Sequence, residues 1–321
     1  MYLNHFSDTL TALDMTELEE FENLKESAAD LGISHGEDVR YRSRNIVMRH
    51  QRFHFLEWGS PKDPPLLLLH GSNQSSHSWD LVSLHLCSRY HVFALDQRGH
   101  GDSEWNRGAH YSVEDMAMDA ESFLRTLEIT SPIVIGHSMG GMVTLALANN
   151  CPELLKGIVV VDIGPEVNEL GARMIREFVG KNFEFDDLDE FLDRVAKYDT
   201  YRSRQHIERT IKYNLIRRAD GRYVTKNDRR RYANNTKKVE SLGAPSLAQL
   251  QKLSIAMLVV RGGDSNVLTA DAAQRFVSAL PNARLETVAD CGHNVASQNT
   301  LGFLAAITPF LTEIQDSGSR T

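Results

Sequence analysis

Residues 132–150 read PIVIGHSMGGMVTLALANN, and this stretch decides the fold. A short apolar run leads into GHSMG at 136–140, which matches the G-x-S-x-G pattern, and a helical pattern follows it. In this pattern a sharp turn between a strand and a helix lifts the serine hydroxyl above the sheet, and small flanking residues let both elements approach. The stretch therefore predicts a strand, an exposed nucleophilic Ser138 and a helix that begins beside it.

The strand at 132–136 belongs to a longer alternation of short apolar runs and helical patterns. Most of the apolar runs are rich in Val, Ile and Leu on both faces, which is typical of strands covered on both sides of a parallel sheet. Strands are expected at 52–58, 65–70, 90–95, 132–136, 157–162, 255–261 and 284–289, and helices at 112–128, 139–150, 269–280 and 297–314. The sequence thus predicts an α/β fold with a mostly parallel central sheet flanked by helices.

The alternation stops between about residues 163 and 250, where helical periodicity and many charges replace the strands. We interpret this segment as a helical cap inserted after a strand end. The predicted organisation is an acidic helical extension at 1–44, an α/β core at 45–162 and 251–314, a helical cap at 163–250 and a flexible tail at 315–321.

Charge is distributed unevenly along the chain. Residues 1–40 contain ten acidic and two basic side chains, whereas residues 200–240 contain thirteen basic and four acidic ones. Either the acidic arm packs across the basic stretch or both are independent solvated faces, and we favour the solvated faces because charge runs are usually exposed. The basic stretch would also favour substrates that carry a carboxylate, since clustered cations attract anions.

Composition and motifs narrow the function classes. The 321 residues carry a net charge of −8, which disfavours a general nucleic-acid binder. No apolar run reaches the roughly 18 residues of a membrane span, and the first residues do not read as a secretory signal. Three scattered cysteines fit a reducing compartment, so we expect a cytoplasmic protein. No phosphate loop, dinucleotide fingerprint or zinc spacing is present, so no cofactor or metal is expected.

A serine nucleophile needs a base and an oxyanion hole. His293, in the DCGHN turn at 290–294, follows the last predicted strand and would be the last member of the chain order Ser, acid, His. One oxyanion donor would be the backbone N–H of Met139, directly after the nucleophile. The second would come from the loop after the strand that ends at His70, and we choose Ser72 with Asn73 as the alternative.

Together these segments resemble the α/β-hydrolase superfamily over about residues 45–314. The resemblance rests on four blocks, which are HGS at 70–72, DQRGHGDS at 96–103, the Ser138 elbow and the Gly292-His293 turn. It is closest to members with a helical cap that hydrolyse ester or C–C bonds, and it implies a mechanism without cofactor or metal.

Two carboxylates compete for the role of the acid. Most members of the superfamily place it after the strand that here ends near Val260, but there Ser265 occupies the expected position and Asp264 lies one residue early. The other location that the superfamily uses is the end of the preceding core strand, where this chain has Asp162. A carboxylate that closes a buried strand needs a partner, and histidine would supply it. We favour Asp162 and keep Asp264 as the alternative.

These residues predict a serine hydrolase that cleaves small carboxylic esters through a Ser138-His293-Asp162 triad. Trp79, Ser75 and Arg98 are expected at the substrate pocket. The alternatives are hydrolysis of a C–C or amide bond by the same residues, or a hydrolase-like receptor or scaffold that binds a small molecule without turnover. A homodimer is compatible with the sequence.

Overall fold

The computed structural model describes residues 17–37, 39–181, 184–233 and 244–317. The first sixteen residues of the predicted acidic extension and the last four of the predicted tail lie outside these ranges. Within them, no helix combines the length and the apolar character that crossing a membrane requires.

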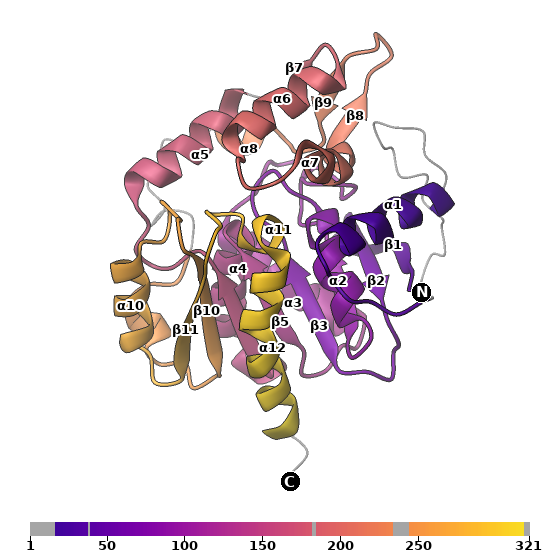
Figure 1. Cartoon of the computed structure of the whole chain (residues 1–321). Helices are drawn as coiled ribbons and strands as arrows, with labels where there is room; N and C mark the ends of the chain where they lie inside the picture. Colours follow the sequence, from indigo (N-terminus) through magenta and orange to yellow (C-terminus); the bar gives the residue numbers. More distant parts are fainter. Residues whose placement is uncertain (1–16, 38, 182–183, 234–243, 318–321) are drawn as a thin grey trace.

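The centre of the molecule is an eight-stranded sheet of order β1-β2-β4-β3-β5-β6-β10-β11 (Figure 1). β1, β2 and β4 pair antiparallel, and all other neighbours pair parallel, which confirms the mostly parallel sheet. The strands are β1 (Tyr41–Met48), β2 (Gln51–Trp58), β3 (Pro65–Leu69), β4 (His91–Leu95), β5 (Ile133–His137), β6 (Gly157–Val161), β10 (Met257–Gly262) and β11 (Ala283–Val288).

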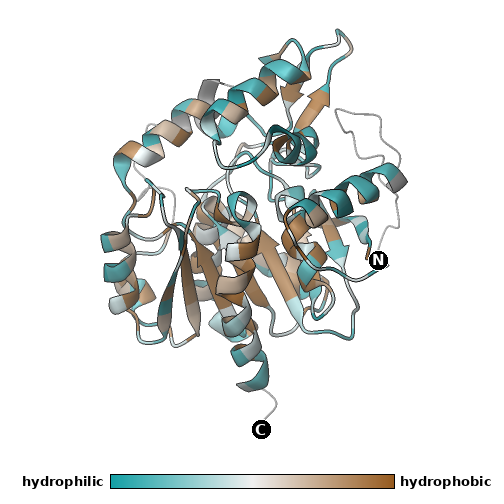
Figure 2. Cartoon of the chain, viewed as in Figure 1, coloured by the Kyte–Doolittle hydropathy of each residue, from teal (hydrophilic) through white to brown (hydrophobic). Residues whose placement is uncertain are grey.

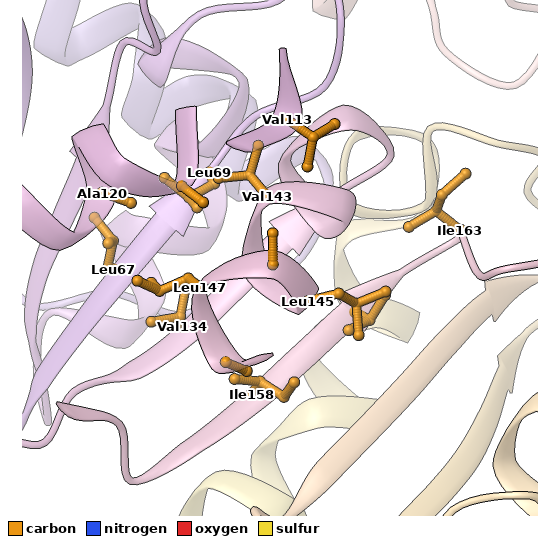
Figure 3. Packing of buried hydrophobic residues seen from close by; sticks show 14 of the residues in the cluster. Leu67, Leu69, Val113, Ala120, Val134, Val143, Leu145, Leu147, Ile158 and Ile163 are labelled. Carbon is orange, nitrogen blue, oxygen red and sulfur yellow. The ribbon is translucent and has the colours of Figure 1, made fainter. Parts of the chain in front are cut away.

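Alternate residues of the central strands enter two separate hydrophobic clusters, one on each face of the sheet. In β3, Leu67 and Leu69 belong to one cluster, whereas Leu66 and Leu68 belong to the other. The first cluster is covered by α3 (Val113–Thr126), α4 (Met139–Asn150) and α10 (Ala270–Ser278), and Figure 3 shows part of it. The second is covered by α1 (Glu17–Asp30), α2 (Asp80–Leu86) and α12 (Thr300–Ser317). Burial on both faces explains why these strands are continuous apolar runs.

The sequence patterns did not predict β1. Its residues, YRSRNIVM, are mostly polar and only partly buried, because β1 lies at the edge of the sheet and pairs on one side with β2. An edge strand of this kind lacks the apolar signature that identified the central strands.

Residues 163–250, called the insertion below, separate β6 from β10. The described elements between residues 169 and 233 lie beyond the carboxyl ends of the parallel strands (Figure 1), whereas residues 247–250 pack against α4 of the core. The insertion has its own small core, formed by residues that include Phe185, Phe191 and Ile207, and its helices contain both hydrophilic and hydrophobic residues (Figure 2). It also contains a three-stranded sheet of order β7-β9-β8, which the sequence patterns did not predict because its strands have only two or three residues. Its elements are α5 (Glu169–Lys181), β7 (Glu184–Phe185), α6 (Leu188–Tyr198), α7 (Arg204–Ile211), η3 (Lys212–Asn214), β8 (Leu215–Arg217), β9 (Tyr223–Thr225), α8 (Arg230–Ala233) and α9 (Leu247–Leu250).

The acidic helix α1 contacts both α2 of the core and α7 of the insertion. Phe21, Leu24 and Ala28 are buried on its inner face, and Asp30 lies 3.8 Å from the imidazole of His206 on α7. The described part of the acidic arm therefore packs against the basic segment, and our preference for two separate solvated faces was wrong. The apolar side chains on one face of α1, rather than its negative charge, determine where the helix packs.

Candidate active site

The elbow at Ser138 joins β5 to α4 through a residue with φ of 52° and ψ of −113°. The backbone N–H of Ser138 donates to the carbonyl of Val161 at 2.9 Å, which ties the turn to the neighbouring strand. A Cβ at Gly136 would collide with the carbonyl oxygen of Gly140, and a Cβ at Gly140 would collide with that of Leu69. Both positions therefore require glycine, and the close approach of strand and helix holds the strained turn that presents the serine.

His293 lies in the loop between β11 and α11 (Val295–Gln298) and contacts both Ser138 and Asp162. Its Nε2 is 2.9 Å from the Ser138 Oγ, and its Nδ1 is 2.8 Å from the Asp162 Oδ2. A carboxylate only accepts hydrogen bonds, so Nδ1 carries the proton of the neutral ring. Nε2 is then the acceptor that faces the serine hydroxyl, as a general base requires.

Asp162 directly follows β6 and is completely buried. Its Oδ1 accepts the backbone N–H of Gly262 at 2.9 Å, and its Oδ2 accepts the hydroxyl of Ser265 as well as the imidazole. These three donors satisfy a carboxylate that would otherwise be costly to bury. They also fix the direction in which Asp162 faces His293.

Asp264 points elsewhere. Its Oδ2 accepts a hydrogen bond from the Tyr201 hydroxyl at 3.1 Å, and no hydrogen bond joins this carboxylate to His293. Of the two carboxylates left open by the sequence, the structure brings Asp162 to the histidine. Ser265, one residue further along, reaches the same site through its hydrogen bond to Asp162.

The predicted oxyanion donors lie around the serine. Met139 is the first residue of α4, where backbone N–H groups lack partners within the helix and the helix dipole favours negative charge. Ser72 and Asn73 line the same cavity as Ser138, and Asn73 adopts a positive φ of 59°. The choice between the amides of Ser72 and Asn73 stays a prediction.

A cavity of about 130 Å³ opens beside Ser138 and His293. Much of its wall comes from the insertion, which contributes both apolar and polar side chains. The apolar ones are Ile175, Phe178, Phe191, Val195, Tyr198 and Ile211, and the polar ones are Asp199, Arg202, Thr210 and Asn214. The cavity can therefore hold a ligand that is partly apolar and partly polar, next to the nucleophile.

None of the three predicted pocket residues lines this cavity, although Trp79 lines a small neighbouring pocket together with Gln74 and His137. The predictions for Arg98 and Ser75 are corrected. Arg98 is buried and uses its guanidinium on Asp119 and on the carbonyl of His110, which leaves it no part in contacting substrate. Trp79 is buried against Phe303. Ser75 is buried at the start of the short helix η1 (Ser76–Trp79).

His137 precedes the nucleophile and supports the loop of the base. Its Nε2 donates to the carbonyl oxygen of His293 at 2.9 Å, and its ring lies 4.9 Å from that of His293, centroid to centroid. Burial lowers the pKa of His137 to about 3, and the neighbouring His293 adds to this effect. His137 is therefore neutral at pH 7 and holds the loop without adding charge to the site.

Sequence reasoning missed two residues that hold this arrangement. Ser265 binds Asp162, as described above. Gln298 accepts the backbone N–H of Gly292 at 2.8 Å, next to His293, and donates to Asp199 at 3.1 Å. Neither belongs to a motif, although Ser265 in the usual position of the acid was a signal that this loop still faces the site.

One group among the described residues has the spacing of a metal site, namely His54, Asp96 and Asp102. The ligand atoms of these three side chains already have hydrogen-bond or ion-pair partners within the chain. Asp96 accepts from His54 at 2.7 Å and from the backbone N–H groups of Ser76 and Asp102, while Asp102 pairs with Lys226 at 2.6 Å. These contacts hold the 96–103 loop, and none of the three residues lines the cavity beside Ser138.

Comparison with known proteins places this geometry in a family. The family model for the alpha/beta hydrolase fold matches residues 64–300. The esterase Rv0045c of Mycobacterium tuberculosis is 28% identical over 297 residues, which cover 88% of this chain and 93% of that protein. A 2-(acetamidomethylene)succinate hydrolase of Mesorhizobium japonicum is 25% identical over 289 residues, which cover 88% of this chain and 98% of that protein.

Solved structures agree with this assignment. The crystal structure of esterase Rv0045c superimposes with a TM-score of 0.72 at 25% identity, and the match covers 91% of this chain and 98% of that one. The structure of an E-2-(acetamidomethylene)succinate hydrolase gives a TM-score of 0.78 at 23% identity, over 85% of this chain and 100% of that one. With most of its length matched by the family model, the chain belongs to the alpha/beta hydrolase family.

Proposed function

We propose that this hydrolase cleaves carboxylic esters through an acyl-enzyme formed on Ser138. The observation that carries the proposal is the continuous chain of hydrogen bonds from Ser138 through His293 to Asp162 at the wall of a cavity. Nucleophile, base and orienting acid within hydrogen-bond reach are the arrangement that activates a serine hydroxyl. Esterase Rv0045c, similar over nearly the whole chain, supports an ester as the substrate.

In the first half of the reaction, the Ser138 Oγ attacks the ester carbonyl carbon while His293 Nε2 takes the hydroxyl proton. Negative charge develops on the carbonyl oxygen and is stabilised by the Met139 amide together with that of Ser72 or Asn73. The C–O bond to the alcohol then breaks, and His293 returns the proton to the leaving alkoxide. Asp162 keeps the imidazole in the required tautomer and stabilises its charged form.

In the second half, water replaces the alcohol. His293 Nε2 takes a proton from the water, whose oxygen attacks the acyl carbon, and the proton returns to the Ser138 Oγ as the acid leaves. Every step uses side chains and amides of this chain. The insertion, residues 163–250, would act as the cap that sets substrate size, because it supplies much of the cavity wall. The free cysteines fit a cytoplasmic protein.

An amide bond is the second candidate. The relative from Mesorhizobium japonicum carries the name 2-(acetamidomethylene)succinate hydrolase and aligns over 88% of this chain. The same three residues would serve, since acyl transfer from an amide needs the same nucleophile and base.

The test is hydrolysis of p-nitrophenyl esters from acetate to decanoate by wild type, Ser138→Ala and Ser88→Ala. Ser88 is an exposed serine outside the cavity and serves as the matched control. We expect turnover by wild type and Ser88→Ala, with a chain-length optimum that reports the depth of the cavity, and a loss of about a thousandfold or more in Ser138→Ala. Equal activity in all three proteins would contradict the proposal.

A further inference from the structure

Arg202 lies in the wall of the cavity, between α6 and α7 of the insertion. It is the one arginine or lysine among the described residues that line this cavity, and its side chain is only 13% exposed. A guanidinium in such a position is expensive to bury unless its charge and its N–H groups are used. The hydrogen bonds that Arg202 makes within the protein therefore show which of its N–H groups remain for a ligand.

Two protein contacts hold Arg202 in one orientation. Its Nε donates to the Asp199 Oδ2 at 2.7 Å, and its Nη1 donates to the Thr210 Oγ1 at 3.2 Å. An arginine has five N–H groups in a fixed fork, and these contacts use two of them. None of the described residues accepts a hydrogen bond from Nη2. The guanidinium is thus fixed at one edge and keeps unused donors at another.

Asp199 does not use up the N–H donors of Arg202, because its carboxylate also accepts hydrogen bonds from other residues. Its Oδ1 accepts the side-chain amide of Gln298 at 3.1 Å and the backbone N–H of Tyr201 at 3.3 Å. Asp199 therefore fixes the orientation of the Arg202 guanidinium without binding its Nη2. Burial lowers the pKa of a second cation, Arg209, and the charge of the neighbouring Arg202 adds to this effect; Arg209 is paired with Asp80 at 3.1 Å.

We propose that Arg202 binds a carboxylate of the substrate, so that the preferred substrate is an ester with a free carboxylate at some distance from the scissile bond. The inference rests on the proposed function and names its substrate class. The acyl carbon would lie at Ser138, an apolar linker would lie against side chains such as Phe178 and Phe191, and the carboxylate would accept from Arg202. Arginine suits this role because its planar fork matches a carboxylate and stays charged.

The kinetic test compares mono-p-nitrophenyl adipate with p-nitrophenyl hexanoate, which has the same acyl length and no charge. Wild type should favour the adipate ester by about tenfold or more in kcat/KM, since hydrogen bonds to charged groups are the stronger class. Arg202→Gln should abolish this preference by raising KM for the adipate ester, so that kcat/KM falls at least about tenfold further for the adipate ester than for the hexanoate ester. Equal kcat/KM for both esters in wild type, or an equal loss on both in Arg202→Gln, would overturn the proposal.

Arg202→Lys provides a variant that keeps the charge beside Asp199 but loses the fork. It should retain part of the preference for the adipate ester, and it replaces Arg202→Gln if the latter fails to fold. A lysine variant with the full preference of wild type would overturn the role assigned to the planar fork, and a lysine variant that loses as much kcat/KM on the hexanoate ester as on the adipate ester would overturn the carboxylate site.

A binding measurement separates this inference from the proposed function. Titration calorimetry of adipate monomethyl ester into Ser138→Ala and into Ser138→Ala/Arg202→Gln has no need of turnover. Binding that depends on Arg202 supports the carboxylate site even if wild type hydrolyses no ester, in which case only the proposed function fails. Hydrolysis of the hexanoate ester without Arg202-dependent binding would leave the esterase standing and overturn the carboxylate site.

Discussion

Replacing Asp162 with asparagine tests which carboxylate orients the base. The backbone N–H of Gly262 faces the Oδ1 of Asp162 and can only donate, so the carbonyl oxygen of an asparagine would settle there. Its NH₂ group would then face the Nδ1 of His293, 2.8 Å from the present Oδ2. Nδ1 would have to accept, and the ring proton would move to Nε2. That nitrogen would then donate towards Ser138 and could no longer take the serine proton.

The magnitude follows from this change of tautomer. Where an aspartate that orients a catalytic histidine becomes asparagine, kcat falls by roughly 10⁴ with the geometry intact. We expect a loss of about 10³ to 10⁴ in kcat for Asp162→Asn. Asp264→Asn is the matched control, because its amide oxygen can still accept the Tyr201 hydroxyl, and it should change kcat by less than about threefold.

The assay is steady-state hydrolysis of p-nitrophenyl butyrate at pH 7.5 by wild type and both variants, with thermal melts to show that each is folded. The reverse ranking of the two folded variants would refute the reasoning and assign the role of the acid to Asp264. Comparable activity in all three proteins would refute the requirement for a carboxylate beside His293.

Three further predictions concern Ser265, His137 and the buried cysteines. Ser265→Ala removes a hydroxyl donor to Asp162, and we expect kcat to fall by about tenfold, between the two asparagine variants, in the same assay. Burial lowers the pKa of His137 to about 3 in the folded protein, whereas the pKa of a histidine in the unfolded chain is about 6.5. Between these two values only the unfolded chain binds the proton, so the stability of the fold decreases as the pH falls below about 6.5. The free energy of unfolding, measured with urea, should therefore fall between pH 7 and pH 5. In His137→Gln this fall should be about 2 kcal/mol smaller than in wild type. An equal fall in both proteins would contradict the neutral His137. Burial raises the pKa of Cys87 and Cys291 to about 11, so these two thiols of the folded protein should resist Ellman's reagent at pH 8 for minutes, while the denatured chain reacts at all three thiols. Rapid reaction of more than one thiol in the folded protein would contradict the burial of Cys87 and Cys291.

The central strands and the elbow were predictable because their signals are local. Buried parallel strands must be apolar on both faces, and the turn at Ser138 requires glycine at fixed positions. β1 was not predictable from the same rule, because an edge strand with one partner keeps polar residues. The position of α1 depends on its contacts with α2 and α7 and on the packing of Phe21 against Tyr41, which no pattern within the helix specifies.

The site divides in the same way. Ser138 and His293 occur in motifs whose order along the chain is characteristic, so the sequence alone made them candidates, and the structure brings them within hydrogen-bond distance. Arg98 was misplaced because a lone arginine near a strand end does not reveal its partner, here Asp119. Arg202 and Gln298 come from the insertion and from α11, and their meeting at Asp199 depends on the fold. Contacts between segments that are distant in sequence leave no local signal.

The central claim is that Ser138 is a nucleophile activated by His293. Diethyl p-nitrophenyl phosphate tests it directly, because an activated serine attacks the phosphorus, expels p-nitrophenolate and keeps the diethylphosphoryl group. The account predicts one diethylphosphoryl group per chain by intact mass, located on the peptide that contains Ser138, with labelling at least about a hundredfold slower in His293→Ala and absent in Ser138→Ala. Labelling of another residue, or equal rates with and without His293, would contradict it.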